Sequence, residues 1–180
     1  MPKTARRWLI ACVLTAAAGA AVWYDATRFE PHHPKLYRVD VPIVGLPDAL
    51  EGLRIVQLSD LHLVRFGKRE QRALALIRQA QPDLIVLTGD YMGDGGITPG
   101  YRADEARRSL LRLLGRLQAK YGVFGVTGNW DPARAGPWLG VQMLENEGRV
   151  IQVREGKVWL AGVPEGNAEP ERALRSRPPE

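Results

Sequence analysis

The sequence has few of the residues that build disulfide-rich or thiol-based proteins. Only Cys12 among the 180 residues is a cysteine, and it lies in an apolar N-terminal segment, which excludes an intrachain disulfide. Histidine is also scarce, at positions 32, 33 and 62 alone. There is no Walker loop, no Gly-x-Ser-x-Gly elbow and no cysteine placed for catalysis, so the sequence indicates neither a nucleotide-binding loop of the Walker type nor a covalent nucleophile.

The composition is that of an ordinary globular chain. Hydrophobic residues make up 45% of the sequence and charged residues 25%, which excludes a mainly disordered protein. The formal net charge is +5 and the isoelectric point about 9.7. No run of five like charges occurs, and most arginines fall in expected helices beside Glu or Gln. We therefore do not expect direct nucleic-acid binding.

The N-terminus carries a candidate targeting segment. Lys3, Arg6 and Arg7 precede residues 8–24, which contain no charge and reach the short end of what spans a bilayer core. This pattern predicts a signal peptide or an uncleaved signal-anchor over residues 1–24, with a buried core helix as the alternative. Basic residues before the apolar run predict that the rest of the chain lies on the extracytoplasmic side of a cytoplasmic membrane, or in an exported form if the signal is cleaved.

Residues 25–34 are expected to form a linker. His32 and His33 are bracketed there by Pro31 and Pro34, which favours a solvated pair over a metal site.

The rest of the sequence predicts an α/β domain with a mostly parallel central sheet. Alternating strand and helix patterns are typical of βαβ units. Residues 84–87 are continuously apolar and predict a central strand buried on both faces. The expected strands are 35–43, 53–58, 84–87 and 122–126; the expected helices are 68–80, 103–120, 137–147 and a short one at 171–175; residues 150–153 and 158–163 are expected to form a hairpin.

Metal-binding side chains follow three of the expected strands. Asp60 and His62 follow the strand at 53–58, Asp90 follows 84–87, and Asn129 follows 122–126. Because ligands bind beyond the carboxyl ends of parallel strands, we expect these four side chains to converge. Carboxylate, imidazole and amide groups suit divalent Mn, Fe or Zn, which activate a water for hydrolysis of phosphate esters. Residues 93–96 are expected to form a flexible loop at the mouth of the site.

The motifs resemble those of the calcineurin-like metallophosphoesterases. The matching segments are LSDLH at 58–62, LTGD at 87–90 and VTGN at 126–129, in the family's order and at similar separations. The segments GLP at 45–47, GLRIVQ at 52–57 and LAGV at 160–163 look like the membrane-associated bacterial branch of that family. The resemblance covers residues 36–165.

The resemblance implies a fold, a site and an activity. The fold would be part of an αββα sandwich of two sheets flanked by helices, with a metallophosphoesterase domain at 35–165 and a tail at 166–180. Asp60 and His62 would bind the first of two metal ions, Asp90 would bridge, and Asn129 would bind the second; Asp90 and Asn129 would be the catalytic pair. The substrate would be a phosphate mono- or diester, including lipid- or nucleotide-linked ones.

Two departures from the family pattern affect the expected activity. Trp130, followed by Asp131, stands where the family has the histidine that assists the leaving group, and an indole cannot act as a general acid. The family also supplies further histidines after the hairpin, whereas this sequence has none after His62. We therefore expect a chain truncated before those motifs, which holds one or two metal ions.

Three interpretations stay open at this point. The first is a metal-dependent phosphoesterase with weak or incomplete activity. The second is a degenerate member that binds at most one metal and serves as a non-catalytic, membrane-tethered module. The third is a membrane-tethered interaction protein unrelated to metals. An incomplete second layer would expose apolar strands, which leaves room for a homo-oligomer or a complementing chain.

Overall fold

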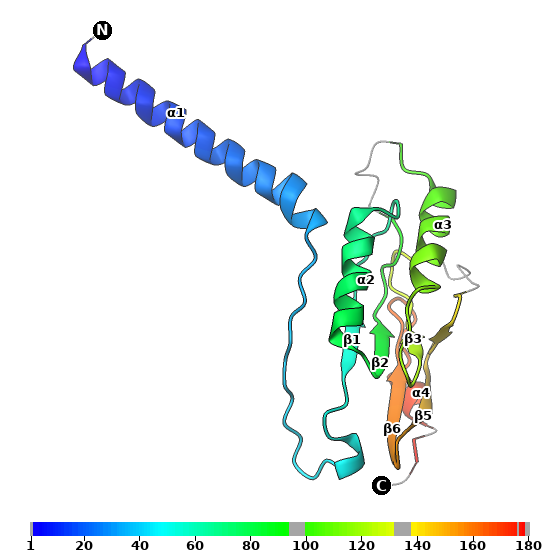
Figure 1. Ribbon diagram of the computed structural model, residues 1–180. Helices are drawn as coiled ribbons and strands as arrows, with labels where there is room; N and C mark the ends of the chain where they lie inside the picture. Colours follow the sequence, from blue (N-terminus) through cyan, green and yellow to red (C-terminus); the bar gives the residue numbers. More distant parts are fainter. Residues whose placement is uncertain (1, 94–99, 132–137, 176, 179–180) are drawn as a thin grey trace. The chain divides into compact units, whose positions relative to one another are not determined.

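The computed structural model describes residues 2–93, 100–131, 138–175 and 177–178, and it divides the chain into two units, Met1–Lys35 and Leu36–Glu180 (Figure 1). The first unit contains helix α1 (Lys3–Tyr24), a π-helical turn (Asp25–Phe29) and a 3-10 turn (Glu30–His32). The segment expected to be a linker thus begins with helical turns. His33 closes them, because its ring stacks on Phe29 with the centroids 3.7 Å apart.

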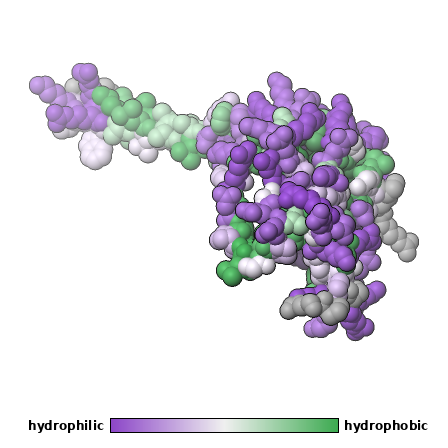
Figure 2. Space-filling model, turned by 60° about the horizontal axis from the view of Figure 1, so that its bottom comes forward, coloured by the Kyte–Doolittle hydropathy of each residue, from purple (hydrophilic) through white to green (hydrophobic). Residues whose placement is uncertain are grey.

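Helix α1 has the length and surface of a membrane-spanning helix. Its 22 residues rise about 33 Å, against about 30 Å for the hydrocarbon core of a bilayer. None of its residues is buried, and apolar side chains cover most of its length (Figure 2). A window of suitable hydropathy runs within Lys3–Thr27, near the N-terminus, where a signal sequence has the same properties.

The second unit is organised around a four-stranded parallel sheet. Its strands are β1 (Ile55–Leu58), β2 (Leu84–Leu87), β3 (Val123–Gly125) and β4 (Val141–Met143), hydrogen-bonded in that order. Helix α2 (Lys68–Ala80) connects β1 to β2, and α3 (Ala103–Leu114) lies between β2 and β3 (Figure 1). Strand β2 is central and largely buried, as its apolar sequence predicts.

The two faces of the sheet are covered by different layers. Alternate residues of β2 point to opposite faces: Ile85 and Leu87 pack with the apolar faces of α2 and α3. Leu84 packs on the other face against the antiparallel hairpin of β5 (Glu147–Val153) and β6 (Gly156–Gly162). Two short helices complete the unit, η3 (Asp48–Leu50) and α4 (Pro170–Leu174). The order helix, parallel sheet, hairpin confirms the predicted α/β class and the partial sandwich.

The structure corrects the prediction for residues 35–43. They form no strand, and the alternating apolar side chains of Tyr37, Val39, Val41 and Ile43 are 57–81% exposed. Alternation predicts a strand only where a neighbouring strand supplies hydrogen bonds and a covering layer, and the described residues supply neither here.

The helix predicted at 137–147 is also wrong over its described part, 138–147. A turn at Leu139 and Gly140 leads instead into β4, and β5 begins at Glu147. Gly140 takes a left-handed φ of 78°, and Val141 is β-branched, which favours pairing with β3 over a helix. Helix α3 is shorter than the expected 103–120, because it ends before Gly115.

Candidate metal centre

The first site residues lie where the loops after β1 and β2 continue side by side beyond the strands. The backbone N–H of Asp60 donates to the Gly89 carbonyl at 3.2 Å, and that of His62 donates to the Asp90 carbonyl at 2.9 Å. Leu63 continues this pairing with a hydrogen bond to the Tyr91 carbonyl at 2.9 Å. Asp60 and His62 are therefore held beside Asp90, although about 30 residues separate them in sequence.

Three of the four predicted ligands come together at this edge. One ligand atom each from Asp60, His62 and Asp90 lies within 4.8 Å of the others. His62 Nε2 is 3.9 Å from Asp60 Oδ1 and 3.9 Å from Asp90 Oδ2. Nitrogen and oxygen ligands bind Zn²⁺ at about 2.0–2.2 Å, so two ligands of one ion lie at most about 4.4 Å apart. Both 3.9 Å separations fit that limit.

The backbone of all three residues is in the left-handed region. Asp60, His62 and Asp90 have φ values of 52°, 39° and 57°. A non-glycine residue pays of order 1 kcal/mol or more for this conformation, and such residues concentrate at functional sites. Only six non-glycine residues in the described part of the chain have positive φ, and three of them are these. The strained backbone points to a site at this place.

His62 presents a defined nitrogen to its two carboxylate neighbours. Its Nδ1 lies 2.9 Å from the Gly93 carbonyl, which can only accept a hydrogen bond, so Nδ1 carries the proton. In the neutral ring Nε2 then has its lone pair free, and it is Nε2 that faces Asp60 and Asp90. A hydrogen bond on the second nitrogen is what orients metal-binding histidines in general. Gly93 is a partner that the sequence did not identify.

Two glycines bring the loop after β3 against Asp90. A Cβ built on Gly89 would lie 2.6 Å from the Gly128 nitrogen, and one built on Gly128 would lie 2.2 Å from Asp90 Oδ1. No side chain fits at either position. The backbone N–H of Trp130 donates to Asp90 Oδ1 at 3.1 Å. Asn129, whose side chain is exposed, therefore lies between two residues that contact Asp90.

The Asp131 side chain connects the loops after β2 and β3 through hydrogen bonds, a role that the sequence did not indicate. The residue is buried, and its Oδ2 accepts hydrogen bonds from the backbone N–H groups of Asp90 at 2.8 Å and Gly128 at 2.9 Å. Its Oδ1 accepts from Tyr91 N–H at 2.8 Å. Burial raises the pKa of Asp131, and these donors act against that shift. The sequence offered one signal for this role, because Asp131 comes three residues after Gly128, whose backbone N–H it accepts from.

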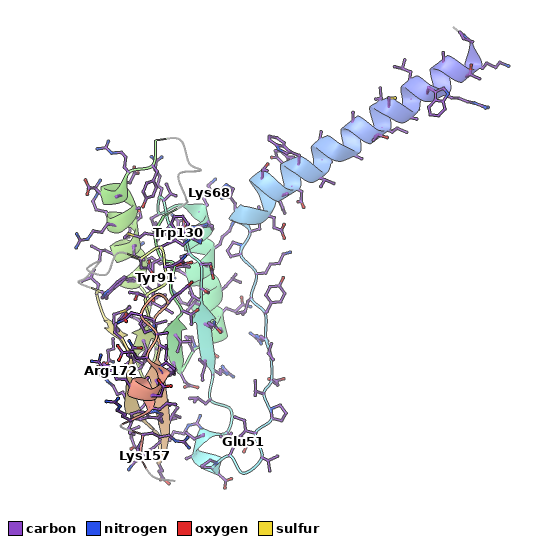
Figure 3. All side chains as sticks on the ribbon, turned by 180° about the vertical axis from the view of Figure 1, so that it is seen from behind. Glu51, Lys68, Tyr91, Trp130, Lys157 and Arg172 are labelled. Atoms are coloured by element: carbon purple, nitrogen blue, oxygen red, sulfur yellow. The ribbon has the colours of Figure 1, made fainter. Side chains whose placement is uncertain are left out.

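Tyr91 and Trp130 are aromatic residues of the loops after β2 and β3, and Figure 3 labels both at the end of the sheet opposite Lys157. The Tyr91 hydroxyl donates to the Val126 carbonyl at 2.5 Å, and burial raises its pKa. The Trp130 side chain is 48% exposed and meets the His62 ring edge-on at 6.1 Å. A surface cavity of about 300 Å³ lies here, lined by Met92, Gly93, Tyr101, Ala103, Asn129, Trp130 and Asp131.

The two other histidines, expected to be a solvated pair, are separate from this group. His32 and His33 belong to the unit Met1–Lys35, and no metal-binding group among the described residues includes them. Of the loop predicted at 93–96, Gly93 is described and residues 94–96 lie outside the described part of the chain.

Comparison with known proteins agrees with the family resemblance of the sequence motifs. The family model for calcineurin-like phosphoesterases matches residues 53–175. A transmembrane protein with a metallophosphoesterase domain from Danio rerio is 30% identical over 88% of this chain. The UDP-2,3-diacylglucosamine pyrophosphatase LpxG of Chlamydia muridarum is 35% identical over 67% of the chain, and the uncharacterized metallophosphoesterase YkuE of Bacillus subtilis is 29% identical over 73%. The chain spans 36%, 36% and 46% of the length of these relatives.

Proposed function

The chain belongs to the calcineurin-like phosphoesterase family, whose members hydrolyse phosphoric esters with metal ions, and from this premise we propose that it is itself a metal-dependent phosphoesterase centred on Asp60, His62 and Asp90. The observation that carries the proposal is the convergence of these three side chains on strained backbone at the carboxyl edge of the sheet. In the proposed site Asp90 has the central place, because it contacts the loops after both β1 and β3.

The donor set suits a divalent ion. Two carboxylates and an imidazole favour Mn²⁺, Fe²⁺ or Zn²⁺. Asn129 would add an amide oxygen from the loop whose Trp130 N–H contacts Asp90. When bound, such an ion lowers the pKa of a coordinated water and neutralises charge on the phosphate. One ion would have three ligands, Asp60, His62 and Asp90, whereas a second would have Asp90 and Asn129.

The chain's own residues would do the remaining work. Asp60, 67% exposed in its side chain, leaves the site open to solvent, whereas Asp90 at 15% is held by backbone contacts. The Trp130 indole offers one N–H donor and no titratable group, so the proton for the leaving group must come from water. Removing a positioned general acid costs typically 10²–10⁴ in rate, and we therefore expect slow turnover.

One observation favours a second candidate, a module that binds one metal ion without turnover. Of the three histidines in the sequence, only His62 lies in the unit that holds the site. An incomplete ligand set would keep one ion and lose the second, and a complementing chain or second copy could then be needed for hydrolysis.

The proposed setting is a membrane surface. Helix α1 and the transmembrane protein among the relatives indicate membrane association. We propose that the domain lies on the extracytoplasmic side, since Lys3, Arg6 and Arg7 precede the apolar run. A lipid- or nucleotide-linked phosphate ester is the proposed substrate class, in line with the name of the LpxG relative.

The test is hydrolysis of an aryl phosphodiester by the full chain with added Mn²⁺. We expect turnover that disappears with a chelator, returns when metal is added back, and is lost in Asp90→Ala. Equal rates for wild type and Asp90→Ala would refute the enzyme. Metal content after purification then tests whether the chain binds metal at this site at all. Bound metal that persists in the double variant, Asp60→Ala together with Asp90→Ala, would refute the shared site.

A further inference from the structure

The helix layer of the second unit carries a large excess of positive over negative charge. Residues 65–78 and 102–120, which include most of α2 and α3, contain 11 Lys and Arg against three Asp and Glu. Of the totals of 25 and 20, the rest of the chain has 14 and 17 and is therefore net negative. The net charge of +5 is therefore the sum of +8 in this layer and −3 in the rest of the chain.

Two of the three acids in this layer are already paired within it. Glu70 is buried and accepts a hydrogen bond from Arg69 at 2.6 Å. Glu105 accepts one from Arg65 at 2.7 Å, and this contact lowers the pKa of Glu105. Asp104 is the third acid. The remaining cations of the layer are exposed to solvent.

Six exposed residues define what we call the basic helix face: Arg65, Lys68, Arg72, Arg108, Arg112 and Arg116. One part of this face lies before and on α2, and the other lies on and after α3. The two parts meet at Phe66, because Arg112 and Arg116 both stack on its ring, at 4.5 and 5.0 Å from the centroid. Among the described residues no carboxylate lies within 4.0 Å of Arg108, Arg112 or Arg116. Lys68 begins α2, at the end of the sheet where Trp130 lies (Figure 3).

We propose that the basic helix face docks on an anionic lipid bilayer. The charge of the face favours a polyanion as the partner. Helix α1 favours a lipid bilayer among polyanions, because a helix of this length and apolar surface would hold the domain at a membrane. Tethering raises the effective concentration of the face at the lipid surface, which makes weak charge contacts sufficient. This inference does not depend on phosphoesterase activity.

The segment between the two units permits such docking. Residues 33–47 form no helix or strand, and at about 3.4 Å per residue they extend to about 50 Å. Any face of the domain can therefore reach the bilayer, and charge decides which one does. Each basic residue near an anionic surface shifts the docked-to-free ratio about fivefold. Removal of two charges should lower that ratio about 25-fold.

The test uses the full chain in lipid nanodiscs. Since Cys12 is the one cysteine, a Cys12→Ser background accepts a single labelling site. Ala75→Cys places a fluorophore on the exposed side of α2, and Glu155→Cys places it in the exposed turn between β5 and β6 as the control. Quenching by spin-labelled lipid headgroups is compared between phosphatidylcholine discs and discs that also contain phosphatidylglycerol.

We expect stronger quenching at position 75 in the anionic discs, and loss of this difference at high salt. Arg108→Gln with Arg112→Gln should lower the docked-to-free ratio about 25-fold. The matched pair Lys157→Gln with Arg175→Gln, both exposed on the hairpin side, should leave it unchanged.

Three results would overturn the proposal. The first is equal quenching in the two kinds of disc, or failure of the chain to associate with anionic discs. The second is an equal effect of the two charge pairs. The third is displacement of the face from the disc by an RNA duplex at equal phosphate concentration, which would assign the face to nucleic acid. Circular dichroism of each variant verifies that the fold is kept.

Discussion

Asp131 supports the candidate site from inside the fold, and its substitution gives the sharpest test of the geometry. Its carboxylate accepts three backbone hydrogen bonds, from Asp90, Tyr91 and Gly128, at 2.8–2.9 Å. Asp131→Ala leaves these donors without a partner. An unsatisfied buried donor costs about 1–3 kcal/mol, and because water can enter part of the space, we expect a total loss of about 3–5 kcal/mol in the free energy of unfolding.

The conservative variant separates shape from charge. In Asp131→Asn the amide oxygen can replace Oδ2 and keep the bonds to Asp90 and Gly128, but the amide NH₂ then faces the Tyr91 N–H, donor against donor. We expect a loss of about 1–3 kcal/mol. Glu145→Gln is the matched control, because Glu145 is an exposed carboxylate that accepts from the Thr127 N–H and hydroxyl. Its loss should stay within about 0.5 kcal/mol.

The assay is urea unfolding of the full chain in a mild detergent, followed by tryptophan fluorescence, with Mn²⁺ affinity measured on the same samples. Both Asp131 variants should also weaken Mn²⁺ binding, by roughly 10–100-fold, since the carboxylate holds the backbone of Asp90. An Asp131→Asn protein as stable as wild type within about 0.5 kcal/mol would refute the reasoning. So would a stability loss in Glu145→Gln as large as that in Asp131→Asn.

Three further substitutions test other contacts of the site. Burial raises the pKa of Tyr91, so above about pH 10 the unfolded chain releases a proton that the folded chain keeps, and the free energy of unfolding falls by up to about 1.4 kcal/mol per pH unit. Tyr91→Phe should flatten this fall in alkaline denaturation. An unchanged slope would contradict the burial argument. Gly128→Ala places a methyl group 2.2 Å from Asp90 Oδ1 and should weaken Mn²⁺ binding at least about tenfold. Gly67→Ala is the control, because its methyl group would lie 3.6 Å from Glu70 Oε2 and should not change the Mn²⁺ affinity. Equal affinities of the two variants would contradict the close approach at Gly128. Trp130→His should raise residual hydrolysis without changing metal content, and an unchanged rate would show that this position does not serve the leaving group.

Local sequence was sufficient for the elements whose pattern and neighbours agree. The apolar run at 84–87 became the central strand, and the amphipathic repeats became α2 and α3. The convergence of Asp60, His62 and Asp90 followed from the parallel topology, because the carboxyl ends of parallel strands share one edge. Their roles as metal ligands, and that of Asn129, stay predictions.

Residues 35–43 and 138–147 show where local pattern fails. Both have an apolar periodicity, but a strand needs a partner for its backbone and a helix needs a face to bury, and those partners are distant in sequence.

The sequence by itself determined the family motifs, the strands and helices between residues 55 and 125, and the apolar N-terminal helix, because each depends on residues near one another in the chain. Only the tertiary structure decided that Asp131 holds the loops of the site, that Gly93 orients His62, and that Arg112 and Arg116 stack on Phe66 next to α2. These depend on distances between segments about 30–50 residues apart, and such distances exist only once the chain has folded.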